Sequence, residues 1–289
     1  MSLRLCGDHT DYATISAAIA AGPDGVSVLA GAVAGTGNAY PEAISITKRV
    51  TLSGDLALPT GPGVRITGAG GGAAPAVLSS GNGKLTLNNF EVSNAGSAAV
   101  YVVEGNVAED WFSRLLIRGG GVAKCLQGQF MENLILADGA AALDPSCGGQ
   151  VICYHLTAVN HTDYGLLCNA SGWAQGCLAY NCNALGFSNL FSAIYSAWNG
   201  ADDATPPGVL AKTGLTLADI AFLNYAGGDY RLSPATLAYQ PGISPVDVDF
   251  LGNRRLRAGA VDLRIVMGGH DPWPGAPSFI TPGSAIRRF

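Results

Sequence analysis

The sequence predicts an all-β fold: a single right-handed parallel β-helix with a short helix capping its N-terminal end. Two observations predict it. Short β-rich runs are separated by glycines, and these runs recur at a spacing in the low twenties of residues. A chain of 289 residues suits one such domain, because a solenoid grows by adding coils. A β-sandwich of short strands is the alternative that the same pattern leaves open.

The capping helix is predicted over Asp11–Gly22. Asp11 is placed to act as N-cap, and Gly22 supplies a C-terminal stop. The apolar side chains fall on one face at the i, i+3, i+4 spacing, namely Ile15, Ala18 and Ile19. The helix is short and its apolar face is narrow, so we expect it to cover the open end of a stack of strands.

Strand-like runs follow the helix, with turn residues between them. The first set comprises Val26–Leu29, Ile44–Thr47, Val50–Ser53, Val64–Thr67 and Ala76–Ser79. The second set comprises Leu85–Val92, Arg114–Ile117, Asn133–Leu136, Tyr154–Ala158 and Cys177–Tyr180. A parallel series comprises Val100–Val103, Cys125–Gln127, Ala141–Leu143, Leu166–Cys168 and Leu185–Phe187. Two or three short strands per coil are typical of a β-helix.

The spacing of the second set predicts which residues stack. Aligning Val92, Ile117, Leu136, Ala158 and Tyr180 gives steps of 25, 19, 22 and 22 residues. Asparagines follow several of these runs, namely Asn94, Asn160, Asn181 and Asn199. Asparagine tolerates the left-handed backbone conformation, so we expect these residues at the corners of coils.

The composition narrows the classes of partner. Hydrophobic residues make up 48% of the chain and charged residues 13%, against about 25% charged residues in typical soluble domains. The net charge of -5 has no basic stripe, which argues against nucleic acid as a ligand. No apolar run reaches the ~20 residues of a membrane span, and the N-terminus lacks a signal-peptide pattern. We therefore expect synthesis in a host cytoplasm, no export by the general pathway and no membrane contact.

The cysteines are predicted to be reduced. There are seven of them, an odd number, in a chain that we expect not to be exported. Most lie in apolar strand-like runs, so we expect buried thiols at Cys125, Cys153, Cys168, Cys177 and Cys182. No C-x-x-C pair is present, and no second close pair completes a zinc site beside Cys177 and Cys182. We expect no metal.

Two groups of segments, one at each end of the chain, carry a family resemblance. The N-terminal segments are Tyr12–Gly22, Val26–Gly31, Tyr40–Ile46 and Val50–Gly54. The C-terminal segments are Gly228–Pro234, Asp249–Arg255 and Gly259–Asp262. They resemble the opening and closing segments of the pectate-lyase-like superfamily of right-handed parallel β-helices. The resemblance brackets residues 12 to 262 and implies the fold. It leaves the activity open, because the superfamily contains lyases, hydrolases, adhesins and phage virion proteins.

The resemblance to pectate lyases implies a candidate calcium site, formed by clustered aspartates with an arginine or lysine nearby as the base. Glycoside hydrolysis instead needs two carboxylates on either side of the sugar. The candidates for an acid–base role are Asp110, Glu132, Asp138 and His161. Asp110 and Glu132 lie about one coil apart, as do Asp138 and Asp163. No lysine or arginine stands within two residues of these four carboxylates. We therefore expect no assembled catalytic site. The glycine-rich residues 68–72 are not followed by the Lys-Ser/Thr pair of a phosphate-binding loop, and we expect no cofactor.

Tryptophans are the candidates for stacking on sugar rings, namely Trp111, Trp173 and Trp198. The alternative reading is packing at the edges of coils.

We divide the chain into a β-helix domain with its N-terminal cap, residues 1–262, and an extended proline-rich arm, residues 263–289. The arm combines helix-forbidding prolines with large apolar residues that we expect to bind a partner, namely Trp273, Phe279, Ile280, Ile286 and Phe289.

These features favour a non-enzymatic structural protein of a bacteriophage particle, either a capsid decoration or a tail-associated subunit. Its expected partners are other virion proteins and further copies of itself, and resemblance to phage β-helix proteins implies a homotrimer. Its expected location is the virion. The alternative is a polysaccharide lyase or glycoside hydrolase, such as a tailspike-like depolymerase that acts on the host surface polysaccharide.

Overall fold

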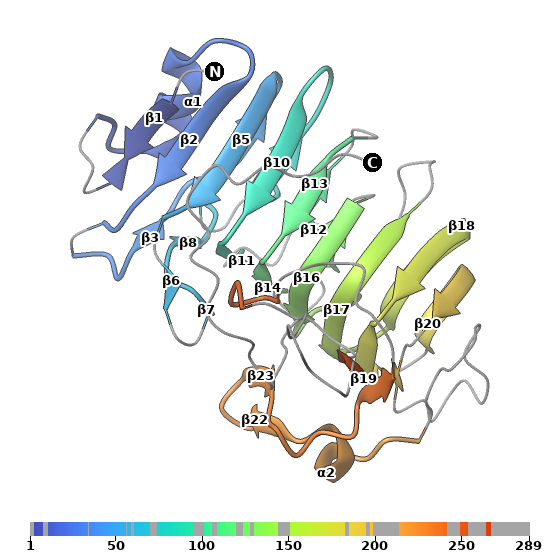
Figure 1. Ribbon diagram of the computed structural model, residues 1–289. Helices are drawn as coiled ribbons and strands as arrows, with labels where there is room; N and C mark the ends of the chain where they lie inside the picture. The colour runs from blue at the N-terminus through green and yellow to red at the C-terminus, as the bar shows by residue number, and fades with distance from the viewer. Residues whose placement is uncertain are drawn as a thin grey trace.

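The computed structural model is a parallel β-solenoid, which confirms the predicted fold class (Figure 1). Paired strands of neighbouring coils run parallel, so the β-sandwich alternative is wrong. The structure describes residues 3–7, 11–33, 35–55, 57–58, 61–69, 74–94, 101–105, 109–119, 124–127, 130–143, 151–182, 185–194, 197–198, 214–241, 249–253 and 264–266.

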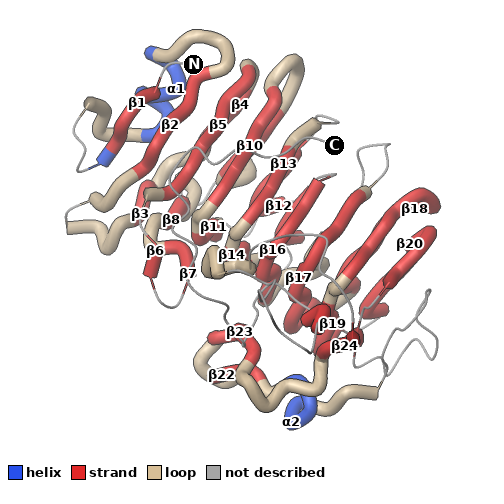
Figure 2. The backbone as a smooth tube through the Cα atoms, viewed as in Figure 1, coloured by secondary structure: helices blue, strands red, loops and turns tan. Residues whose placement is uncertain are grey.

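The strands form three walls, each a stack of equivalent strands from successive coils (Figure 2). Wall 1 begins with β1 (Leu3–Cys6), β2 (Val26–Ala30), β5 (Arg49–Gly54), β10 (Lys84–Asn88) and β13 (Trp111–Ser113). It continues through the first halves of β16 (Phe130–Ala137) and β17 (Ile152–His161) and the second halves of β18 (Tyr164–Gln175) and β20 (Leu185–Ile194).

Wall 2 follows wall 1 around each coil. Its strands are β3 (Ala39–Tyr40), β8 (Arg65–Ile66), β11 (Glu91–Ser93), β14 (Leu116–Arg118), the second halves of β16 and β17, β19 (Leu178–Cys182) and β21 (Ala197–Trp198). Wall 3 comprises β4 (Ile44–Ile46), β9 (Val77–Ser79), β12 (Tyr101–Gly105) and β15 (Lys124–Gln127). Single bridges from Leu126 to Leu143 and from Leu143 to Leu166 extend wall 3.

The predicted stacking register is largely confirmed in wall 2. Val92 pairs with Ile117, Ile117 with Leu136, and Leu136 with Ala158. The last step is wrong by one residue, because Ala158 pairs with Ala179 and Tyr180 pairs with Val159. The coil between β17 and β19 is thus one residue shorter than the spacing of apolar residues indicated.

In the five successive coils that begin with β10, β13, β16, β17 and the second half of β18, one residue in the left-handed backbone conformation makes the corner between walls 1 and 2. These residues are Asn89, Arg114, Asn133, His155 and Gly176, with φ between 52° and 65°. Glycine fits the last position because a Cβ there would lie 2.6 Å from the His155 ring. Arginine and histidine seldom adopt this conformation, so Arg114 and His155 are held there by their packing.

The corner after wall 2 is left-handed at Asp138, Asn160 and Asn181, with φ of 61°, 58° and 55°. This confirms the prediction for Asn160 and Asn181. Asn94 follows β11, the corresponding strand of an earlier coil, but its backbone is not left-handed, so the prediction is wrong for this residue. Its amide donates to the Ala74 carbonyl at 2.9 Å. Asn199 lies outside the described residues.

Helix α1 (Ile15–Ala21) closes the N-terminal end as predicted, but its N-cap is Thr14. Asp11 as N-cap is wrong, because the Thr14 hydroxyl accepts the Ala17 amide at 3.1 Å while Asp11 is exposed before the first turn. The carboxylate of Glu42 accepts two further orphan amides, from Ile15 at 2.8 Å and from Ser16 at 3.0 Å. The buried face is the predicted one, Ile15, Ala18 and Ile19.

A segment after the last coil folds back over the outside of wall 2 (Figure 1). It contains α2 (Leu217–Ile220), β22 (Phe222–Asn224) and β23 (Asp229–Leu232), and the turn 249–253 packs beside it. We call residues 214–241 together with the turn 249–253 the C-terminal strap. Two small antiparallel pairs complete the structure, β6 (Ala57–Leu58) with β7 (Gly61–Pro62) and β24 (Tyr239–Pro241) with β25 (Arg264–Val266). The domain boundary predicted at residue 262 lies outside the described residues.

The interior of the solenoid is one apolar cluster that runs from α1 to β19. Free thiols at Cys125, Cys153 and Cys177 are buried, as predicted, and Cys182 is partly buried. Burial raises the pKa of the Cys125 thiol to about 12, so this thiol stays protonated and unreactive. The side chain of Cys168 lies outside the described residues.

Replacing one interior leucine tests this stacking directly. Leu87 is fully buried and sits in register between Leu52 and Phe112 of the adjacent coils. Leu87→Ala should lower the free energy of unfolding by about 2 to 5 kcal/mol, measured by urea denaturation. The matched control Leu223→Ala, at a residue 47% exposed on β22, should change it by about 0.5 kcal/mol or less. Equal losses in the two variants would contradict the packing described.

Candidate functional site

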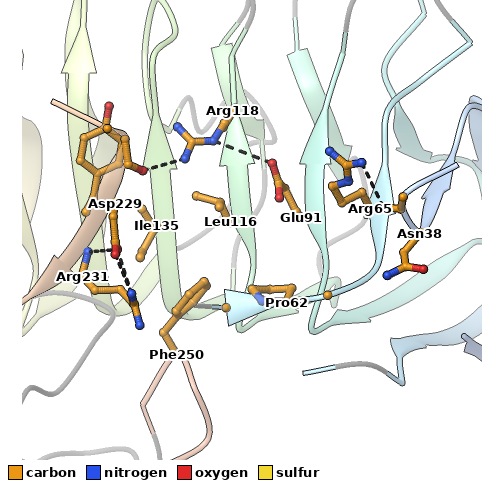
Figure 3. Close-up of a pocket in the computed structure, with 16 residues that line it drawn as sticks. Asn38, Pro62, Arg65, Glu91, Leu116, Arg118, Ile135, Asp229, Arg231 and Phe250 are labelled. Atoms are coloured by element: carbon orange, nitrogen blue, oxygen red, sulfur yellow. Dashed lines mark hydrogen bonds and ion pairs between the residues drawn. The ribbon is translucent and has the colours of Figure 1, made fainter. Parts of the chain in front are cut away.

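A groove of about 410 Å³ lies where the C-terminal strap meets wall 2. Charged side chains cross it in a row, and Figure 3 shows Arg65, Glu91 and Arg118 rising from the neighbouring strands β8, β11 and β14. Asp229 and Arg231 of β23 continue the row on the strap. The apolar lining includes Pro62, Leu116, Ile135 and Phe250.

The register of wall 2 explains why the groove opens here. The outward positions of successive strands are Arg65, Glu91, Leu116, Ile135, Thr157 and Leu178. The later, mainly apolar positions need cover. Leu178 packs with Ile220 and Leu232 of the strap, and Ile135 packs with Tyr230 and Phe250. The strap therefore covers the later coils, while the charged positions of the earlier coils form the open end.

Arg118 is the hub between wall 2 and the strap. Its Nη2 donates to the Gly228 carbonyl at 2.7 Å and its Nη1 to the Asp138 carboxylate at 2.9 Å. Its Nε lies 3.9 Å from a carboxylate oxygen of Glu91. The guanidinium carbon also lies 5.6 Å from the centroid of the Tyr230 ring, at cation–π distance. Arg118 is thus held by hydrogen bonds, an ion pair and an aromatic face.

A polar ladder at the second corner fastens the strap. The Tyr230 hydroxyl donates to Asp138 at 2.9 Å, and the Asn160 amide donates to Asp138 at 3.2 Å. The Asn181 amide donates to Asn160 at 2.8 Å, and the Tyr225 hydroxyl also donates to Asn160. Burial and the bond to Asp138 raise the pKa of Tyr230 to about 12, so its proton remains available to the carboxylate.

Arg114 makes a second connection, from the first corner to the turn 249–253. Its Nε donates to the Phe250 carbonyl at 3.3 Å, and Nη2 donates to the Leu251 carbonyl at 3.4 Å. Burial lowers the pKa of this guanidinium, and the charge of Asp249 opposes that shift. The left-handed conformation of Arg114 thus serves to direct its side chain at the strap.

The predicted acid–base candidates are dispersed through the solenoid. Asp110 is fully buried, and its carboxylate accepts the Leu85 amide at 2.7 Å and the Ser79 hydroxyl at 3.1 Å. Glu132 pairs in register with Ser113, three residues along the wall from Asp110, a displacement of roughly 10 Å. The expected stacking of Asp110 on Glu132 is therefore wrong. Asp138 lies in the polar ladder beside the groove.

His161 lies inside the solenoid, near enough to Asp138 to interact with its charge, but its ring contacts the backbone carbonyl of Leu136. It is 2% exposed, and its Nε2 contacts the Leu136 carbonyl at 3.0 Å, which assigns the proton to that nitrogen. Burial lowers its pKa to about 4, although the carbonyls of Leu136 and Gly139 and the charge of Asp138 act in the opposite direction. The ring is therefore neutral at pH 7.

The tryptophan candidates lie in both main walls. Trp111 is partly exposed on the outer face of wall 1 and stacks on Phe130, with ring centroids 5.9 Å apart and planes 5° apart. Trp111 pairs with Phe130, Phe130 with Ile152, and Ile152 with Trp173, so the backbone positions of Trp111 and Trp173 lie in one register column of wall 1. Trp198 pairs with Ala179 in wall 2. The side chains of Trp173 and Trp198 lie outside the described residues.

The partner-binding residues predicted in the arm also lie outside the described residues, namely Trp273, Phe279, Ile280, Ile286 and Phe289.

Across the described ranges, no group of three or more His, Cys, Asp or Glu side chains is placed to hold a metal ion. In the same part of the chain, no helix has the length and apolar character needed to cross a membrane. No protein-family model matches the chain, and no curated protein matches it.

Sequence reasoning missed the groove residues Arg65, Glu91 and Arg118 and the tyrosines Tyr225 and Tyr230. One signal was present. Extending the Val92–Ile117 alignment by one residue on either side places Glu91 beside Leu116 and Ser93 beside Arg118. Arg118 and Glu91 thus lie diagonally on adjacent strands, which indicates a polar surface, but nothing local indicated that the strap returns to it.

The buried neutral His161 predicts acid sensitivity. Its folded pKa of about 4 lies below the usual value of 6.5, so the unfolded chain binds the proton more tightly. Its contribution to stability is complete above pH 6.5 and is lost as the pH falls towards 4, by on the order of 3 kcal/mol. Urea denaturation at pH 7 and pH 4 should show a larger loss for the wild type than for His161→Gln. Equal losses would show that His161 is not the group responsible.

Proposed function

We propose that this chain is a structural subunit of a bacteriophage particle, a capsid decoration or tail-associated protein. The observation that carries the proposal is that the polar side chains considered as catalytic candidates form contacts within the fold. Asp110 binds backbone and hydroxyl groups inside the solenoid, Asp138 fastens the strap, and His161 is a buried neutral ring. These groups stabilise a rigid solenoid. A rigid solenoid offers several flat outer faces for packing against neighbouring subunits in a particle.

The outer face of wall 1 supports association with other subunits. Its central column carries the stacked pair Trp111 and Phe130 and continues to Ile152. Only 13% of the residues in the chain are charged, so a partner surface meets few groups that need desolvation. Aromatic side chains are enriched in the centres of protein interfaces.

The assignment to a phage particle rests on the parallel β-helix together with the superfamily resemblance of the segments at both ends. Under this proposal the chain is made in the host cytoplasm and then joins the virion. Its partners are further copies of itself, as a homotrimer, and other virion proteins. The arm of residues 263–289, with its prolines and large apolar side chains, would tie one subunit to another.

The same aromatic column supports a second candidate function, contact with a host surface polysaccharide by a tailspike-like lyase or hydrolase. The rings of Trp111 and Phe130 are stacked with nearly parallel planes, and the backbone position of Trp173 lies in the same register column. Flat aromatic surfaces of this kind suit the apolar faces of sugar rings. Under this candidate Trp111 contacts the polysaccharide, and cleavage requires Glu132 or Asp138, because Asp110 and His161 are buried inside the solenoid.

Mass spectrometry of purified phage particles from the source tests the first proposal. Peptides of this chain should occur in fixed ratio to the capsid or tail proteins and persist after a high-salt wash. Absence from particles, with the protein recovered free in the lysate, would overturn it. Depolymerisation of host polysaccharide by the wild type, lost in Asp138→Asn or Glu132→Gln with the fold retained, would instead establish the second candidate.

A further inference from the structure

The open end of the groove holds one cationic and one anionic side chain that are not paired with each other. Arg65 and Glu91 are neighbours in register on adjacent strands, yet they form no ion pair. Arg65 donates one hydrogen bond, from Nη2 to the Gly37 carbonyl at 3.0 Å. The carboxylate of Glu91, which is 27% exposed, approaches Arg118 at 3.9 Å and makes no hydrogen bond within the described part of the chain. Figure 3 shows both side chains reaching the groove.

The other charges of the groove are matched within the protein. Asp138 accepts a hydrogen bond from Arg118 at 2.9 Å, and Asp229 pairs with Arg231 at 2.6 Å. Arg118 serves two carboxylates, because it donates a hydrogen bond to Asp138 and forms a longer ion pair of 3.9 Å with Glu91, so the charge of Glu91 is only partly compensated. The groups that can bind a ligand are therefore the guanidinium of Arg65 and the carboxylate of Glu91, about one strand spacing apart at their backbone positions, roughly 4.8 Å. A ligand with complementary charges must carry one anionic and one cationic group close together.

The floor beside these two charges is apolar. Leu116 and Ile135 follow Glu91 in the outward column of wall 2, and Pro62 and Phe250 line the groove opposite. A volume of about 410 Å³ is large enough for an aliphatic side chain together with its backbone groups. The preferred ligand therefore combines a pair of opposite charges with an apolar group.

We propose that this groove binds a zwitterionic α-amino acid with an apolar side chain. The carboxylate accepts charge-assisted hydrogen bonds from the remaining donors of Arg65, and the ammonium donates to the carboxylate of Glu91. The apolar side chain packs over Leu116 and Ile135, towards Phe250. This binding site goes beyond the proposed structural function and does not depend on it.

Titration calorimetry of the full-length protein with leucine tests the proposal. The expected dissociation constant is roughly 0.1 to 10 mM, the range for a ligand with so few atoms. N-acetyl-leucine lacks the ammonium and leucine amide lacks the carboxylate, so each should bind at least about tenfold more weakly. Glycine keeps both charges but lacks the apolar side chain, and it should also bind more weakly.

Two variants and their matched controls locate the site. Arg65→Gln and Glu91→Gln should each weaken leucine binding at least about tenfold. Arg49→Gln and Glu109→Gln change charges that are paired elsewhere, with Asp24 and Lys84, and should leave binding unchanged. Circular dichroism and thermal melting confirm that each variant is folded.

Three results would overturn the proposal. The first is that leucine gives no heat of binding at concentrations well above about 10 mM, the weakest dissociation constant expected. The second is equal binding of leucine, its N-acetyl derivative and its amide by the wild type, which needs no variant to fold. The third is unchanged binding in folded Arg65→Gln and Glu91→Gln proteins.

Discussion

Coil-on-coil register is the constraint on which the rest of this structure depends. Each strand donates and accepts its backbone hydrogen bonds with the strands of adjacent coils, so every coil must turn its corners at equivalent positions. In five successive coils, from β10 onward, one residue in the left-handed backbone conformation makes the first corner, including Asn89, Arg114 and His155. The resulting stack places like positions above one another and builds outward columns of side chains along each wall.

The outward column of wall 2 in turn dictates the fold of the chain after the last coil. Leu116, Ile135 and Leu178 would expose an apolar stripe, and the strap covers it with Ile220, Leu232 and Phe250. Apolar contact alone does not set the position of the strap. Tyr230 meets Asp138 and Tyr225 meets Asn160, so the second corner fixes where the strap sits and where the groove opens.

The sequence was sufficient to predict the elements whose signals are local. The glycine-separated runs and the spacing of Val92, Ile117, Leu136 and Ala158 predicted the fold class and most of the wall 2 register. The helix cap was misassigned because Thr14 competes with Asp11, and Glu42, which completes the cap, comes from another coil. The groove was not predictable, because it joins residues separated by more than 100 positions, such as Arg118 and Gly228.

The central claim is that corner residues of the solenoid hold the strap through specific polar contacts. A double-mutant cycle between Asp138→Asn and Tyr230→Phe measures that contact directly, because the hydroxyl and carboxylate oxygens lie 2.9 Å apart. Urea denaturation of the wild type, both single variants and the double variant supplies the four free energies of unfolding. The structure predicts a coupling free energy of about 1 kcal/mol or more. Additive effects, with coupling below roughly 0.3 kcal/mol, would contradict it.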